Sequence, residues 1–415
     1  MLSLIVAAVS LVAEGQPEDP PLEATTLSTR GSTRGTAYAA ANKIVTLAQK
    51  THAAWLDSAS VTMIQTYDAA TGTWSDPVEV GRGLDNHGGP ALCADAEGYL
   101  HIVFGPHHGP FQYRRTVRPN DASEWTPVEE TGDRATYPSL VCDADGTLHL
   151  AYRGGAQPCK LMYQKRPRAG AWTTPVALVR SPAPSGYTQW GNPLQVDRNG
   201  RLHLAFHFYD VVIHKAGFAA GYLYSDDHGD TWRTTSGKAV ALPATIDTCE
   251  PFLNSDAIDV RVGTIDVGPE GAVYVTVPHL EKGGVTQLWR LRDGAWKALP
   301  MDPHLGSLYG CGPLGQSVVS VAADGAVYIL CSVCVAGWSD PAQEVALLVS
   351  RDQGDTFAAR RISPVDPATP NWLPSIERNT GHAPVARPHM MYTHGHAGEG
   401  CTPDLATEIR FVRLR

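Results

Sequence analysis

The sequence has 415 residues, of which 43% are hydrophobic and 18% are charged, and it contains 40 glycines and 31 prolines. This composition favours short strands joined by turns and argues against a helical bundle or coiled coil, which would be rich in Ala, Glu, Lys and Leu. The formal net charge of −9 argues against nucleic acid as a partner, because nonspecific phosphate binding depends on clustered Lys and Arg. An anionic substrate would have to be bound by local cations.

The chain begins with an apolar run, residues 2–13, that is too short to span a bilayer. It is similar to the hydrophobic region of a secretory signal, although no basic region precedes it. We therefore expect a signal peptide over residues 1–13, a secreted or periplasmic protein and no membrane insertion; an ordinary apolar N-terminus is the alternative. Residues 14–35, rich in Pro, Thr, Ser and Gly, are expected to form a linker. One domain is expected over 36–415.

One hairpin pattern repeats along this domain. Each copy has an apolar strand, a polar turn ending in Gly, and a second apolar strand with a central His or aromatic residue. Apolar residues alternate on both sides of the turn, as in half-buried strands. A period near 50 residues built from such hairpins is typical of a β-propeller. The clearest copies are residues 93–105, 141–154, 195–208, 266–279 and 321–333.

Two segments that follow such hairpins, 225–232 and 350–357, match the Asp-box pattern Ser-x-Asp-x-Gly-x-Thr-Trp/Phe. We expect their Asp, Gly and aromatic residues to serve turn bonding and packing. Four strands per unit predict an all-β fold, a β-propeller of seven blades of four-stranded antiparallel sheets, with six or eight blades as alternatives. The units are 38–80, 87–128, 137–178, 192–242, 258–299, 317–362 and 381–415, and the final strand, 408–415, is expected to close the ring beside the N-terminal segment.

The repeat also separates scaffold from function, since a residue type found at one place in many units is structural. His101, His149 and His203 occupy the same position in the middle of a strand, and Tyr274 and Tyr328 fill it in later units. We therefore predict that these three histidines belong to the scaffold.

Unusual polar residues stand just before the first strand or just after the second strand of the hairpins in blades two to four. Both places lie on the same rim of a propeller, beside the central channel, because the two strands run down and back. Polar groups that converge at such a mouth predict a ligand site. The residues are Asp85, Asn86, His87, His107, His108, Tyr137, Arg153, Tyr187, Trp190, Asn192, His207 and Tyr209.

Structural alternatives stay open for individual members of this set. His87 lies in a turn-rich segment that could be a capped loop, Arg153 could form a structural ion pair, and Tyr137 could simply pack beside Pro138. At most one of the adjacent His107 and His108 is expected to face the channel. We expect substrate contacts from Asn86, His108, Tyr187, Trp190, Asn192, His207 and Tyr209.

Around these residues the sequence resembles the BNR-repeat propellers that include the ulvan lyase-like polysaccharide lyases. The similar segments are 85–116, 136–155 and 192–232. The resemblance implies that His87, His107, Tyr137 and Arg153 form the lyase site. The sequence departs from the family at residues 206–209, which read Phe-His-Phe-Tyr where the family usually has a Trp-x-Trp-Arg-like segment. That difference leaves the identity of the sugar open.

The residue types suit β-elimination on a uronate-containing, ulvan-like polysaccharide, sulfated or not. The C5 proton lies α to a carboxylate, and it becomes acidic enough to remove only when that carboxylate is neutralised. Arg153 with one His could neutralise it, Tyr137 or His87 could take the proton, and a Tyr or His could protonate the leaving O4. A phenol needs a neighbouring cation to act as a base, and Arg153 is expected to supply it. No cofactor or metal is required for this chemistry.

Two other functions remain. A sialidase-like glycoside hydrolase would need three arginines and an early Phe/Tyr-Arg-Ile-Pro motif, whereas the rim set contains one clear Arg. The other alternative is a noncatalytic propeller that binds carbohydrate or protein, because a fold does not determine a function. We expect a monomer.

A structural metal is left open by a His- and Cys-rich tail. Its residues are His389, His394, His396 and Cys401, and a solvated loop is the preferred interpretation. Cys331 and Cys334 have C-x-x-C spacing, but no second pair follows at zinc-site spacing, so buried thiols are expected.

Overall fold

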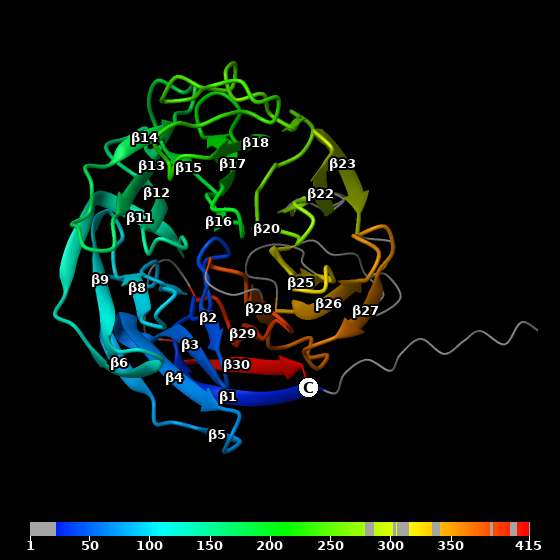
Figure 1. Cartoon of the computed structure of the whole chain (residues 1–415). Helices are drawn as coiled ribbons and strands as arrows, with labels where there is room; N and C mark the ends of the chain where they lie inside the picture. Colours follow the sequence, from blue (N-terminus) through cyan, green and yellow to red (C-terminus); the bar gives the residue numbers. More distant parts are fainter. Residues whose placement is uncertain are drawn as a thin grey trace, which may run out of the picture.

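The computed structural model describes residues 22–278, 286–301, 304, 315–333, 341–381, 385–398 and 405–414. The expected signal peptide and the start of the expected linker lie outside these ranges. Apart from one 3-10 turn, η1 (Ser58–Ser60), the elements are strands. Antiparallel sheets follow one another in chain order around a central axis (Figure 1), so the predicted all-β fold is confirmed. No helix in the described ranges is long and apolar enough to cross a membrane.

Two of the sheets are large. The eight-stranded sheet contains, in spatial order, β14 (Val176–Val179), β13 (Lys160–Arg166), β12 (Leu148–Gly154), β11 (Glu129–Cys142), β9 (Gly109–Arg118), β8 (Leu100–Phe104) and β7 (Ala91–Ala94), with β10 (Asp121–Trp125) beside β9. The nine-stranded sheet contains β28 (Asn371–Ile376), β29 (Met390–His394), β30 (Thr407–Leu414), β1 (Leu22–Gly31), β3 (Lys50–Asp57), β4 (Val61–Asp68) and β5 (Thr73–Trp74), with β2 (Ile44–Leu47) beside β3 and β6 (Val78–Arg82) beside β4.

Three smaller sheets complete the described ring. The five-stranded sheet contains β15 (Thr188–Gln189), β17 (Leu202–Asp210), β18 (Gly217–Ser225) and β19 (Leu253–Asn254), with β16 (Leu194–Val196) beside β17. The two four-stranded sheets are β20 (Ile265–Val267), β21 (Val273–Val277), β22 (Gln287–Arg292) and β23 (Ala295–Pro300), then β24 (Ser317–Val321), β25 (Val327–Val333), β26 (Glu344–Ser350) and β27 (Ala358–Arg361).

The predicted hairpins are present in all five clear copies, as antiparallel pairs of β7 with β8, β11 with β12, β16 with β17, β20 with β21, and β24 with β25. Their turns need a positive φ, which glycine adopts without steric cost. The φ values lie between 80° and 87° at the five turn glycines, Gly98, Gly146, Gly200, Gly271 and Gly325.

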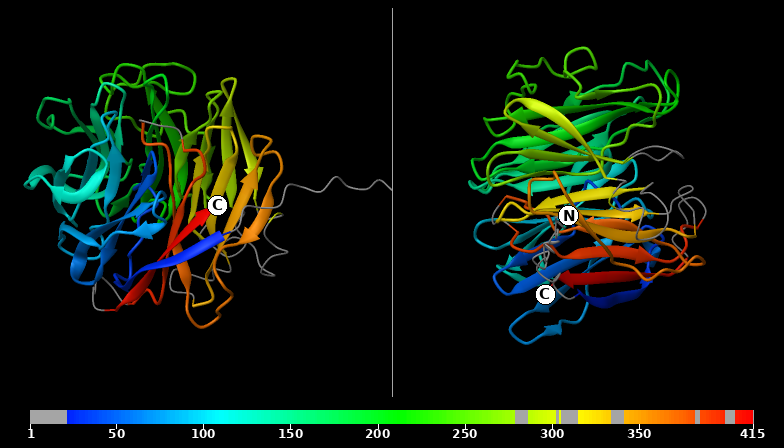
Figure 2. Two further views of the ribbon diagram at one scale, coloured as in Figure 1. Left: turned by 60° about the horizontal axis from the view of Figure 1, so that its bottom comes forward. Right: turned by 90° about the vertical axis from the view of Figure 1, so that its right-hand side faces the viewer.

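The two ends of the chain meet in one sheet. β1 pairs with β30 from Leu22 opposite Leu414 to Gly31 opposite Thr407, and the two strands lie side by side in both views of Figure 2. The expected closing role of the last strand is therefore confirmed. The linker expected over 14–35 is wrong for residues 22–31, because Thr-rich segments also suit strands and the edge of the last sheet needs a partner. The last unit also starts earlier than expected, at β28 rather than at Gly381.

The repeat-equivalent histidines form buried scaffold contacts, as predicted. His149, for example, is fully buried between the Tyr163 hydroxyl, 2.7 Å from Nδ1, and the Asp143 carboxylate, 3.0 Å from Nε2. His101 makes the same contacts with Tyr113 and Asp95, and His203 with Tyr222 and Asp197.

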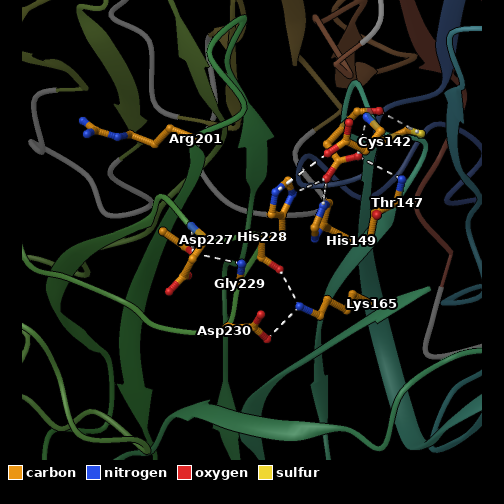
Figure 3. Close-up of polar contacts among 12 residues, drawn as sticks. Cys142, Thr147, His149, Lys165, Arg201, Asp227, His228, Gly229 and Asp230 are labelled. Atoms are coloured by element: carbon orange, nitrogen blue, oxygen red, sulfur yellow. Dashed lines mark hydrogen bonds and ion pairs between the residues drawn. The ribbon is translucent and has the colours of Figure 1, made fainter. Parts of the chain in front are cut away.

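The Asp-box turns make the expected local bonds. The Ser225 hydroxyl donates to Asp227 at 2.8 Å and accepts from the Gly229 backbone at 2.8 Å, and the 350–357 segment repeats both bonds. The first box also binds the preceding unit, because Lys165 donates to the His228 carbonyl and to Asp230 (Figure 3). These boxes therefore fasten the outer strands of neighbouring units.

Candidate functional site

A cavity of about 400 Å³ opens on the predicted rim, where segments preceding the inner strands of several units meet. Five lining residues of the predicted set come from the third and fourth units, and a sixth, His87, comes from the second. The wall includes Arg34, Tyr38, His87, Tyr137, Tyr187, Gln189, Trp190, Asn192, His207 and Arg261.

Asp85 holds two histidines together at one side of this cavity. One of its oxygens accepts from the His87 Nδ1 at 3.1 Å, and the other accepts from the His107 Nδ1 at 2.6 Å. The two imidazole rings are stacked with centroids 3.9 Å apart. Burial would raise the pKa of Asp85, but the hydrogen bonds from His107 and His87 lower it below its usual range. An ionised Asp85 thus fixes both rings with the proton on Nδ1.

His87 presents its other nitrogen to the cavity. Burial, together with the nearby Arg34, lowers its pKa below the usual histidine value, while the bond to Asp85 opposes this shift. Arg34 donates to the His87 Nε2 and, at 2.6 Å, to the Tyr38 hydroxyl. His87 is therefore a neutral imidazole near neutral pH, with Nε2 able to accept a proton when Arg34 turns away.

Tyr137 lies in the same cavity wall as His87, with the Tyr38 ring in contact with both, and it has a strained backbone conformation. Its φ is 60°, and the Asn192 amide holds it by donating to the Tyr137 carbonyl at 2.9 Å. Burial raises the pKa of Tyr137 well above its usual value, and the neighbouring Tyr38 and Tyr187 add to this, outweighing Arg153. Burial therefore has a larger effect on the pKa of Tyr137 than Arg153 has, which does not favour the expected role of Tyr137 as a base. Tyr137 is suited to donate a proton.

Arg153 lies beneath the cavity wall and does not line the cavity. Its side chain is fully buried, one guanidinium nitrogen donates to the Tyr187 hydroxyl at 2.8 Å, and another lies 3.2 Å from His108 Nε2. The guanidinium stacks 4.9 Å from the Tyr137 ring centroid. The sequence analysis expected Arg153 to contact a sugar carboxylate directly. In this conformation the buried Arg153 side chain does not reach the cavity.

Two other arginines do line the cavity, which corrects the expectation of one clear Arg on the rim. Arg34 contacts His87 and Tyr38. Arg261 is held by Asp259 at 2.8 and 2.9 Å, so much of its charge is already neutralised.

Of the predicted substrate-binding residues, Tyr187, Trp190, Asn192 and His207 line the cavity. Trp190 is mainly a core residue, because it is 2% exposed and its indole nitrogen donates to the Cys159 carbonyl at 3.0 Å.

Asn86, His108 and Tyr209 are not part of the cavity wall, contrary to expectation. Asn86 is buried and donates to Thr33 at 3.1 Å. His108 is stacked on the far side of His107, with centroids 4.4 Å apart. Tyr209 lies under the Arg261 guanidinium, 4.2 Å away. His107, which was expected in the lyase site, does not line the cavity either, but it is the one of the adjacent pair that stacks on His87.

The sequence interpretation missed Arg34, Tyr38, Gln189 and Arg261. Arg34 and Tyr38 precede β2, the first inner strand of unit one, and Arg261 precedes β20, the first strand of unit five. The rim rule, which looks for unusual polar residues just before the first strand or just after the second strand of each hairpin, would have found Tyr38 and Arg261 if applied to those two units. Arg34 lies in the segment that was expected to be a linker.

Two groups of side chains could hold a metal ion among the described residues: Asp85, His87 and His107 at the cavity, and Asp143, His149 and His228 at the Asp-box junction of Figure 3. In the tail, His394 bonds Asn371 at 3.0 Å, whereas Cys401 lies outside the described ranges. Cys331 is a buried free thiol, and Cys334 also lies outside these ranges.

Residues 36–302 match the family model described as "BNR repeat-containing family member". Over 143 residues the chain is 28% identical to "Ulvan Lyase-PL25" of Pseudoalteromonas sp. (strain PLSV), a match that covers 28% of this chain and 29% of that protein. It is also 28% identical over 144 residues to "Ulvan lyase" of Nonlabens ulvanivorans, covering 28% and 30% of the two chains. The matched segment thus spans less than a third of either relative.

Solved structures share the fold over almost the whole chain. A PL25 ulvan lyase bound to -[GlcA(1-4)Rha3S]- has a TM-score of 0.74 at 15% identity, with 92% of this chain and 94% of that chain covered. Polysaccharide lyase Uly1 has a TM-score of 0.62 at 14% identity, with 96% and 100% covered.

Proposed function

The chain belongs to the BNR repeat-containing family, and we propose that it is a polysaccharide lyase that cleaves a uronate-containing, ulvan-like polysaccharide by β-elimination. The observation that carries this proposal is the cavity wall on which a neutral His87 held by Asp85, a protonated Tyr137 and Arg34 meet. The likeness to chains named ulvan lyases supports the substrate class.

Charge neutralisation is the first requirement of the reaction. Arg34 lines the cavity and is the cation that we assign to the uronate carboxylate. Arg153 would stabilise the developing enolate charge from below, through Tyr187 and the Tyr137 ring.

Proton transfer then divides between two side chains. When Arg34 moves to the carboxylate, His87 Nε2 loses its hydrogen-bond donor and takes the C5 proton. Tyr137 donates its phenolic proton to the leaving O4, the C4–O4 bond breaks, and a C4–C5 double bond forms in the new end sugar. His107 keeps Asp85 and His87 in place through its bond and its stacked ring.

The test is a panel of uronate polysaccharides, ulvan included, assayed by ultraviolet absorbance for the unsaturated product. Elimination alone generates that product. A sialidase-like hydrolase would release reducing ends without the absorbance, and a noncatalytic binding propeller would give neither signal. Reducing ends without absorbance on every polymer would overturn the lyase proposal.

The pH profile should have a broad plateau. The base must be unprotonated, and since burial and Arg34 lower the pKa of His87, kcat/KM should rise with pH and level off below about 6.5. The acid must be protonated, and since burial raises the pKa of Tyr137, the rate should not fall until above about pH 10. Initial rates across this range would check both limbs, and an acid limb centred above pH 7 would contradict the assignment of His87.

Activity should survive chelation, because arginines neutralise the carboxylate in the proposed reaction. The measurement is turnover before and after treatment with a chelator, followed by readdition of single divalent ions. Complete loss that one metal restores would instead point to the Asp85, His87 and His107 group as a metal site.

We also infer seven blades. The eight-stranded sheet contains two hairpin units that share the long strand β11, and the nine-stranded sheet contains two units that meet where Gly31 pairs with Asp57. Counting each as two blades, with the three smaller sheets, supports the number predicted from the repeat.

A further inference from the structure

His207 occupies a place in its unit that the fold does not prescribe. It lies on β17, four residues after the scaffold histidine His203, just as Arg153 follows His149 on β12. The same place is Gly105 in the second unit, Pro278 in the fifth and Ser332 in the sixth. Because such different residues fit there, the histidine of the fourth unit needs an explanation outside the repeat.

The proton of His207 has a fixed position. Its Nδ1 accepts from the Gly191 backbone at 3.1 Å and from the Val262 backbone at 3.0 Å. A ring nitrogen that accepts hydrogen bonds carries no proton, so in the neutral ring the proton lies on Nε2. Gly191 permits this approach, because a Cβ there would lie 2.7 Å from the His207 Nδ1.

The protonated nitrogen has no protein partner within the described residues. His207 is only 4% exposed and lines the cavity. Burial and the nearby Arg261 lower its pKa well below the usual value, which keeps the ring neutral. An unpaired buried donor is costly in a folded protein, and such a group in a cavity wall is suited to a ligand.

A matching acceptor belongs to the same wall, because Asn192 also lines the cavity. The Asn192 amide nitrogen donates to the carbonyls of Tyr137 and Ala151 at 2.9 and 2.8 Å, so the amide oxygen must face the other way. That oxygen is buried and has no partner in the described part of the chain. An unpaired donor and an unpaired acceptor in one cavity wall suit a hydroxyl, which can accept and donate at once, better than a carboxylate or sulfate, which only accepts.

We propose that His207 and Asn192 form a subsite for one hydroxyl group of the bound sugar, with His207 Nε2 donating to the hydroxyl oxygen and Asn192 Oδ1 accepting its hydrogen. The inference rests on the proposed function for the identity of the ligand as a polysaccharide. His207 acts here as a positioning residue, since it takes no part in proton transfer.

Two substitutions separate this role from a structural one. In His207→Asn the amide oxygen replaces Nδ1 as the acceptor for Gly191 and Val262, but nothing replaces Nε2. In His207→Gln the amide nitrogen reaches the Nε2 position, while the Nδ1 acceptor is lost. We expect His207→Asn to keep its melting temperature and to raise KM for ulvan about tenfold with kcat nearly unchanged. His207→Gln should lower the melting temperature and keep KM closer to that of the wild type.

His203→Asn is the matched control, because His203 is a buried histidine of the same strand that bonds Tyr222. It should lose stability with KM unchanged. A His207→Asn protein with the KM of the wild type would overturn the proposal.

Histidine-selective ¹⁵N NMR of the wild-type protein gives a readout that does not need turnover. The His207 signals should show the Nε2–H form from pH 5 to 8 and should shift on addition of a glucuronate-containing ulvan tetrasaccharide. A proton on Nδ1, or no shift with a tetrasaccharide that binds, would overturn the inference even if His207→Asn failed to fold. A shift of the His207 signals without cleavage of the tetrasaccharide would support the subsite and contradict the lyase proposal. Cleavage without a shift would support the lyase proposal and contradict the subsite. If the tetrasaccharide neither binds nor is cleaved, both proposals fail.

Discussion

Replacing Tyr137 by Phe should lower kcat on the cleaved polysaccharide by about two to four orders of magnitude, the usual loss when a general acid is removed. The ring and its contacts with Tyr38 and Arg153 stay in place, so the fold should be retained. Steady-state rates of unsaturated product, together with a melting temperature, would measure both effects.

Scaffold residues of the same chemistry supply the controls for this variant. Tyr163→Phe removes a buried hydroxyl that bonds His149, and His149→Ala removes that histidine. Each should cost roughly 1–3 kcal/mol of stability and leave the folded protein active. A folded but inactive His149→Ala protein beside a fully active Tyr137→Phe protein would place the site elsewhere.

Replacing Asp85 by Asn should have an effect of similar size, roughly a 10²- to 10⁴-fold loss of kcat. An amide cannot accept from His87 and His107 at once, so one ring must turn or change tautomer. His87 Nε2 would then be lost as a base. The pH profile of the residual activity should lose the acid limb assigned to His87.

Asp95→Asn tests whether any buried Asp–His pair gives this result. Asp95 lies 3.1 Å from His101 in the same unit, but neither residue lines the cavity. This variant should be less stable and keep its turnover per folded molecule. Equal losses of turnover in both variants would contradict a specific role for Asp85.

Much of the fold could be predicted from the sequence, because each hairpin has its own alternating pattern and a turn glycine. The first strand could not, since residues 22–31 have no hairpin partner nearby in the chain. Their partner, β30, is almost 400 residues away, as the pairing of Leu22 with Leu414 shows, and local composition says nothing about such a contact.

The position of the site was predictable to a similar degree. The rim rule brought His87, Tyr137, Asn192 and His207 to one cavity, because strand direction determines which end of a hairpin meets the channel. It could not tell which side chains turn inward, so Arg153 was expected to contact the sugar and is buried instead. The pKa of Tyr137 depends on how many groups cover the ring, which only the packed structure reveals.

The pairing of β1 with β30 imposes an order on biosynthesis. β1 leaves the ribosome well before its partner, because almost 400 residues separate Leu22 from Leu414. Until then β1 has an unpaired edge, which can pair with strands of other nascent chains. The earlier hairpins can form locally as they emerge. Closure of the ring therefore cannot precede the synthesis of β30, and the interval before it is when the edge of β1 is most exposed to aggregation.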